Sequence, residues 1–198
     1  MIQDLDQRIA RIYAAFGLIV ETNIQKTVRM TRSENKIEVR LDGGMSPADI
    51  ENAANTAIGL VAHLPDHLKR WLRSKSQSTA ALDELYKTSL PIQLLADLAN
   101  TEKHGGFDRN GGWSKRQPTL QNIARGLRLD PSNGAASANV RFDLAAGTVT
   151  TESGSPQVVI DAEVVGAGGA VICRLTDLLA AGLSQLEAIY AQHSGQAV

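Results

Sequence analysis

The residues best suited to chemistry lie in one short stretch, residues 97–104, with the sequence Asp-Leu-Ala-Asn-Thr-Glu-Lys-His. At about 100° per residue of a helix, Asp97, Asn100 and His104 share one face. An imidazole can move a proton near neutral pH, and an amide can position a substrate or donate to an oxyanion. The carboxylate of Asp97 can orient such a group. We therefore take these three residues as candidate catalytic residues; the alternative is a face that is merely solvated.

Basic side chains accompany this stretch and continue into a loop over 105–118 that contains four glycines. Lys and Arg contact phosphates, and aromatic rings stack on bases, so the interleaved Phe107 and Trp113 favour a nucleic-acid or nucleotide surface. The alternative is a plain surface loop whose tryptophan packs onto the helices. The glycine pairs match neither nucleotide-binding glycine motif. The candidate phosphate-binding residues are Lys103, Arg109, Lys115 and Arg116.

Two histidines, His63 and His67, are four residues apart, and His104 could complete a three-histidine set. On a continuous helix this spacing can chelate one metal ion. Pro65 lies between them and is expected to bend or break the helix, which removes the geometric basis of the pair. We therefore expect neither a metal nor another cofactor, and keep a metal-dependent helical bundle as an alternative.

The net charge of −1 conceals an uneven distribution. Residues 1–128 carry 18 Lys and Arg against 14 Asp and Glu, a net charge of +4, whereas residues 129–198 carry 2 against 7, a net charge of −5. A basic front part can attract a polyanion that the overall sum would exclude. The alternative is that the uneven charge reflects only a change of composition along the chain and has no function.

Hydrophobic periodicity predicts a mainly α-helical fold, a bundle of about four to five helices with a small antiparallel β appendage before the C-terminal helix. We expect one domain over 1–198, in which 1–128 form mainly the bundle, 139–174 the β insertion and 176–193 the closing helix. Within 1–128, residues 28–41 favour a hairpin over a longer first helix, and 120–129 are ambiguous between helix and strand. The predicted helix starts are Ser46-Pro47, Thr79, Ser89 and Thr176.

Composition excludes several protein classes. The single cysteine, Cys173, allows no intrachain disulfide, and its alternating apolar surroundings favour a core position. No apolar run is long enough to cross a membrane, and the first residues lack the pattern of a secretory signal. We therefore expect a cytoplasmic protein without a membrane partner.

The pair Asn100-x-x-x-His104, late in a helix of a predicted bundle, resembles the HEPN domains of prokaryotic defence and toxin systems. In that family an Arg, a polar residue that is often Asn, and a following His form the motif, and two protomers assemble a metal-independent RNA-cleaving site. The resemblance implies a homodimer that acts on RNA, with His104 as acid or base and Asn100 as the positioning residue. It departs from the motif at Ala99, where the family has its Arg, and Lys103 lacks the planar fork of that residue.

These observations leave two readings open beside the metal-dependent bundle. The first is a HEPN-like protein that binds RNA or a nucleotide, with metal-independent RNA cleavage as its possible activity. The second is a non-catalytic protein-interaction module in which residues 97–104 serve as a structural cap.

Overall fold

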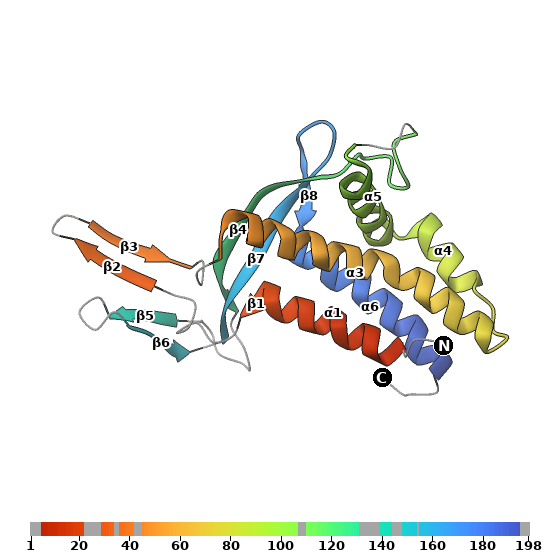
Figure 1. Cartoon of the computed structure of the whole chain (residues 1–198), viewed down its shortest axis with the longest axis horizontal. Helices are drawn as coiled ribbons and strands as arrows, with labels where there is room; N and C mark the ends of the chain where they lie inside the picture. The colour runs from red at the N-terminus through yellow and green to blue at the C-terminus, as the bar shows by residue number, and fades with distance from the viewer. Residues whose placement is uncertain are drawn as a thin grey trace. The chain divides into compact units, whose positions relative to one another are not determined.

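The structure is a computed structural model that describes residues 5–21, 29–33, 36–41, 45–106, 110–130, 139–143, 148–153 and 155–194. It is a mainly α-helical fold with a small antiparallel β part before the C-terminal helix, as predicted (Figure 1). The helices are α1 (Leu5–Ile19), α3 (Pro47–Ser74), α4 (Ala80–Thr88), α5 (Leu90–His104) and α6 (Leu175–Ser194). The strands are β1 (Val20–Glu21), β2 (Arg29–Ser33), β3 (Lys36–Arg40), β4 (Thr119–Asp130), β5 (Asn139–Asp143), β6 (Thr148–Ser153), β7 (Ser155–Val165) and β8 (Val171–Arg174).

Three sheets are formed by the described strands. The largest has the order β1-β7-β4, with β8 also paired to β7, and the β1–β7 and β7–β8 pairs are antiparallel. The other two are hairpins, β2–β3 and β5–β6. The predicted hairpin within 28–41 is therefore confirmed, and the ambiguous segment 120–129 is a strand.

The chain divides into two compact units. One contains Met1–Ala15, Asn55–Asn122 and Ala162–Val198, and the other contains Phe16–Ala54 and Ile123–Asp161. The described candidate residues all belong to the first unit, which is the helical one. The single domain expected from the sequence stays a prediction.

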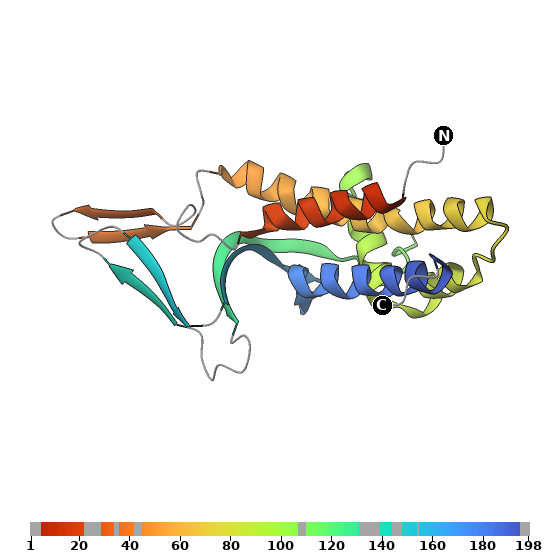
Figure 2. The ribbon, with the colours of Figure 1, turned by 90° about the horizontal axis from the view of Figure 1, so that it is seen from below.

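Leucines and small residues form the core of the helical unit, in which the helices run side by side (Figure 2). Gly182 of α6 allows close packing on α5, because a Cβ there would collide with the Leu95 side chain. This apolar contact fixes which faces of the helices remain for solvent and ligands. Fully buried leucines come from four of its helices: Leu64, Leu68, Leu72, Leu82, Leu94, Leu95, Leu175, Leu179 and Leu186.

The helix ends follow local signals read in the sequence. Asp49 and Ser46 form a reciprocal capping box at the start of α3, with the Ser46 N–H donating to Asp49 Oδ2 at 3.0 Å and the Asp49 N–H to Ser46 Oγ at 3.2 Å. Gly105 ends α5 in the left-handed region, with φ of 65°, a conformation that glycine adopts without steric cost.

Two local expectations were wrong. Pro65 does not break its helix, since α3 continues through it from Pro47 to Ser74, while a bend at Pro65 stays a prediction. Packing of Leu64 and Leu68 into the core on either side of Pro65 favours the continuous helix over the lost backbone hydrogen bond. Thr176 is not a cap, because α6 already begins at Leu175.

Among the residues that the structure describes, no helix is long and apolar enough to cross a membrane.

Candidate functional site

Helix α5 presents most of the candidate residues. Its start is set by Ser89, whose Oγ accepts a hydrogen bond from the Ile92 N–H at 3.3 Å and donates one to Gln185 Oε1 of α6 at 2.5 Å. Leu94, Leu95 and Leu98 bury one side of the helix. The same packing leaves Asn100 and Lys103 exposed on the other side.

Asp97 is buried, with only 4% of its surface exposed, and its carboxylate holds the loop that follows α5. Oδ1 accepts from the Trp113 N–H at 2.7 Å, and Oδ2 accepts from the Ser114 N–H at 2.8 Å and from Ser114 Oγ at 2.6 Å. Gly112 lies directly against this carboxylate at φ of +70°, where a Cβ would collide with the Asp97 oxygens. The loop is therefore fixed to α5 by one carboxylate and one glycine.

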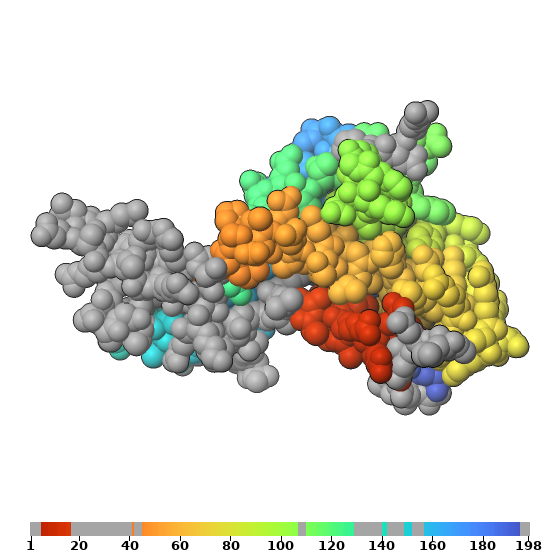
Figure 3. Space-filling model, viewed as in Figure 1, coloured from red at the N-terminus to blue at the C-terminus, as the bar shows by residue number. Residues whose placement is uncertain are grey.

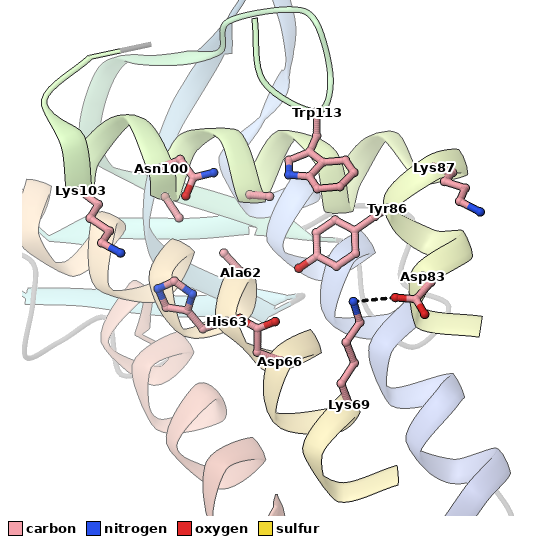
Figure 4. Close-up of a pocket in the computed structure, with 12 residues that line it drawn as sticks. Ala62, His63, Asp66, Lys69, Asp83, Tyr86, Lys87, Asn100, Lys103 and Trp113 are labelled. Atoms are coloured by element: carbon pink, nitrogen blue, oxygen red, sulfur yellow. Dashed lines mark ion pairs between the residues drawn. The ribbon is translucent and has the colours of Figure 1, made fainter. Parts of the chain in front are cut away.

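This anchoring places the indole of Trp113 against the phenol ring of Tyr86 on α4 (Figure 4). The ring centroids are 5.1 Å apart at an interplanar angle of 44°. The Lys69 ammonium lies 5.0 Å from the Tyr86 ring centroid and forms an ion pair with Asp83 at 2.7 Å. Trp113 nevertheless remains 54% exposed, so much of its surface faces solvent.

These side chains border an open cavity of about 500 Å³, which we call the α3–α5 cleft. Helix α3 contributes one wall, α4 and α5 contribute the others, and the anchored loop contributes Trp113 (Figure 4). Its volume lies within the range of small-molecule sites. The polar and aromatic lining residues are His63, Asp66, Lys69, Asp83, Tyr86, Lys87, Asn100, Lys103 and Trp113.

The electrostatics of the cleft are uneven. Burial, with a smaller contribution from the Asp66 charge, raises the pKa of Tyr86 to about 12, so its phenol is neutral. The hydrogen bond from Lys69 lowers the pKa of the Asp83 carboxyl. Lys87 is paired with Glu84 at 3.6 Å, whereas Lys103 has no acidic partner among the described residues. Lys103 is therefore the cation of the cleft that remains available to an anion.

The predicted catalytic residues occupy three different environments. Asn100 lines the cleft, and Asp97 is buried behind it as the loop anchor. His104 is exposed at the last position of α5 and is not a lining residue. The catalytic role of these three residues stays a prediction.

The predicted phosphate-binding residues are also dispersed. Lys103 lines the cleft, while the Lys115 ammonium donates to the Asn110 carbonyl of its own loop at 3.0 Å. Arg116 is exposed outside the cleft, and its carbonyl accepts from the Ala167 N–H at 3.0 Å. Arg109, like Phe107, lies outside the described residues.

The histidine pair is placed on a continuous helix, and only His63 lines the α3–α5 cleft. His63 lines the cleft, whereas His67 Nε2 lies 2.8 Å from a guanidinium nitrogen of Arg8. Arginine can only donate, so His67 accepts through Nε2. Burial and the charges of Arg8 and Arg70 lower the pKa of His67, which favours the neutral ring. Within the described ranges, no group of three or more His, Cys, Asp or Glu could hold a metal ion.

Sequence reasoning missed Tyr86, Asp66 and Asp83 as members of a site. They lie on α3 and α4, far from residues 97–104 in the sequence, and no motif spacing connects them. The sequence carried a signal for Asn100, Lys103 and Trp113, which lie in or next to the basic, glycine-rich stretch.

Comparison of the chain with protein-family models, with curated proteins and with solved structures gave no match. The assignment of function therefore depends on the residues of the cleft.

Proposed function

We propose that this protein is a cytoplasmic nucleotide- or RNA-binding protein whose binding site is the α3–α5 cleft. The observation that carries this proposal is the exposed indole of Trp113, fixed by Asp97 and backed by Tyr86 at the cleft that also contains Lys103. A rigid aromatic surface beside an ammonium that no described acidic residue pairs with suits a ligand with a planar ring and a negative charge.

The aromatic part of this site supports base stacking. Trp113 is held at its backbone by Asp97 and at its ring by Tyr86, so little rotational freedom remains to be lost on binding. Stacking of a base on an aromatic side chain contributes about 1–3 kcal/mol. Because every base has a π face, such a site tolerates different sequences.

The polar part of the site supports a phosphate and a base or sugar edge. Lys103 offers an ammonium for phosphate, and Asn100 offers both an amide donor and an acceptor. His63 lines the same cleft from α3, opposite α5 (Figure 4). A single nucleotide unit fits this combination, either free or within an RNA strand.

Binding can be tested by fluorescence anisotropy with a labelled single-stranded RNA and by calorimetry with a mononucleotide. Trp113→Ala and Lys103→Gln should each weaken binding by about tenfold, since each removes about 1–2 kcal/mol. The matched control is Arg73→Gln, which removes an exposed positive charge of α3 that does not line the cleft. Unchanged affinity in both cleft variants, or an equal loss in the control, would contradict the proposal.

The HEPN resemblance adds RNA cleavage and homodimerisation as further proposals. His104 would act as acid or base from the end of α5, where a second copy of the chain could bring its own His104 near. The absence of the family's Arg, with Ala99 in its place, leaves phosphate contact to Lys103.

Incubating labelled RNA with the protein and with His104→Ala, each with and without chelator, tests cleavage. Activity that His104→Ala loses and chelator leaves intact would support the HEPN-like mechanism. Activity lost only with chelator would indicate a metal-dependent one, and no cleavage would leave binding alone. Light scattering on the purified chain gives the oligomeric state.

One observation favours a second candidate, a non-catalytic protein-interaction module. Both oxygens of Asp97 accept hydrogen bonds from the following loop, so this carboxylate already has a structural role. If neither RNA nor nucleotide binds, the segment 97–104 is better explained as the support of an interaction surface.

A further inference from the structure

A second cavity, of about 300 Å³, lies on the other side of α3, between that helix and α1. We call it the α1–α3 groove. In Figure 3 the surface of α3 lies between the surfaces of α5 and α1. The α3–α5 cleft is lined by residues of α3 and α5, and the α1–α3 groove by residues of α1 and α3. Of the residues that line the groove, only His63 also lines the α3–α5 cleft.

The floor of this groove is apolar. Ile12 of α1 and Leu64 of α3 are buried there, and Leu60 is partly exposed between them. Gly59 widens the groove, because a Cβ built at this position meets no atom within 4 Å. A glycine within a long helix lowers the stability of that helix, so helix formation does not explain why residue 59 is a glycine.

The rim of the groove is cationic. Arg8 donates to the His67 ring at 2.8 Å, a partner without negative charge when the ring is neutral. Arg11 is exposed and has no hydrogen bond or ion pair among the described residues. Two guanidinium groups therefore lie beside an apolar floor without a carboxylate from the described part of the chain to neutralise them.

We propose that the α1–α3 groove binds a small amphipathic carboxylate, an organic acid with a hydrocarbon body. The hydrocarbon covers the partly exposed Leu60 and fills the space above Gly59, while the carboxylate accepts hydrogen bonds from Arg8 and Arg11. A guanidinium presents parallel donors that match the two oxygens of a carboxylate. An apolar pocket with few polar groups at its edge is the usual composition of a small-molecule site.

Isothermal titration calorimetry can test separately what the charge of the ligand and its hydrocarbon body contribute to binding. Octanoate is the probe; octan-1-ol has the same body without charge, and octylamine has the opposite charge. We expect octanoate to bind at a single site per chain, about tenfold more tightly than octan-1-ol. We expect octylamine not to bind. Octanol binding as tightly as octanoate, or no octanoate binding at millimolar concentration, would overturn the proposal.

Variants locate the site. Arg11→Gln should weaken octanoate binding by about tenfold while leaving octanol unchanged, because Arg11 makes no contact that the described fold needs. Arg73→Gln is the matched control, an exposed arginine of α3 that lines neither cavity. Gly59→Leu should abolish binding of both probes by filling the groove, and Gly59→Ala should retain it. Unaltered octanoate binding in Arg11→Gln and Gly59→Leu would place the ligand elsewhere and refute the assignment.

This site is independent of the nucleotide proposal. Gly59→Leu should not affect RNA binding, and Trp113→Ala should not affect octanoate binding. Failure of one proposal therefore leaves the other intact.

Discussion

Asp97 Oδ1 accepts a hydrogen bond from the Trp113 backbone at 2.7 Å, so a buried carboxylate on α5 determines where an exposed indole lies. The second oxygen holds the adjacent residue, Ser114, by its N–H and its hydroxyl. The position of Trp113 against Tyr86 thus follows from the backbone, while its side chain remains available to solvent.

Replacing Asp97 by Asn should lower the free energy of unfolding by about 2 kcal/mol, because an amide cannot accept all three hydrogen bonds. The backbone amides of Trp113 and Ser114 should lose their protection in hydrogen exchange measured by NMR. Glu102→Gln, which neutralises an exposed acid on the same helix, is the control and should change neither quantity. Retained protection in Asp97→Asn would show that the loop is held by other contacts.

Gly112→Ala should destabilise the protein by about 2 kcal/mol. The residue has φ of +70°, and its added Cβ would collide with the Asp97 carboxylate. Urea denaturation gives the change, and near-ultraviolet circular dichroism should report a changed environment of Trp113. A variant as stable as the original chain would mean that the carboxylate can move away without loss of its hydrogen bonds.

Gly59→Ala should have the opposite effect and stabilise the chain by about 1 kcal/mol. Alanine favours a helix interior over glycine, and the space around position 59 accommodates the methyl group. The measurement is again the midpoint of urea denaturation. Destabilisation would indicate that the groove is narrower in solution.

Stability should fall as the pH is lowered through the ordinary histidine pKa of 6.5, because the pKa of His67 is lowered in the folded state. Below 6.5 the unfolded chain takes up a proton that the folded chain accepts only at lower pH. Protonation also ends the hydrogen bond from Arg8 and adds a third charge beside Arg8 and Arg70. His67→Gln, compared with the parent chain by urea denaturation at several pH values, should weaken this dependence; an identical slope would exclude His67 as its source.

Tyr86 should titrate at a pKa of about 12 in a spectrophotometric pH titration, well above the usual value near 10. The folded state favours the protonated phenol, so this contribution to stability is complete below pH 10 and disappears as the pH rises through 12. Tyr86→Phe should remove this component of the titration. If it persists in the variant, it belongs to one of the other two tyrosines.

Most helix starts were predictable because the signals are local, although α6 begins at Leu175 and not after the predicted cap at Thr176. Ser46 with Asp49, and Ser89 with Gly105, satisfy backbone groups within a few residues, so the sequence around them is sufficient. The hairpin within 28–41 followed in the same way from alternation and a short turn. Residues 120–129 lacked such a pattern, and pairing with β7 in the sheet decided that they form β4.

The candidate site was predictable only in part. Asn100, Lys103 and Trp113 were chosen for their chemistry and their neighbourhood in sequence, and the fold places all three at one cleft. Asp97 was chosen with them, yet its burial and its three hydrogen bonds depend on a loop more than ten residues away. Tyr86 and His63 could not be connected to Trp113, because nothing in the spacing shows that α3, α4 and the loop after α5 meet.

The sequence by itself therefore determined most of the helical elements, the caps at Ser46 and Ser89, and the chemical nature of the basic, glycine-rich stretch after Asp97. Only the tertiary structure decided which of these groups are available. Packing of the leucine faces buries Asp97, exposes Trp113 and leaves open space over Gly59. The physical reason is that capping and periodicity act within a few residues, whereas burial and ion pairing depend on which distant faces the core brings together.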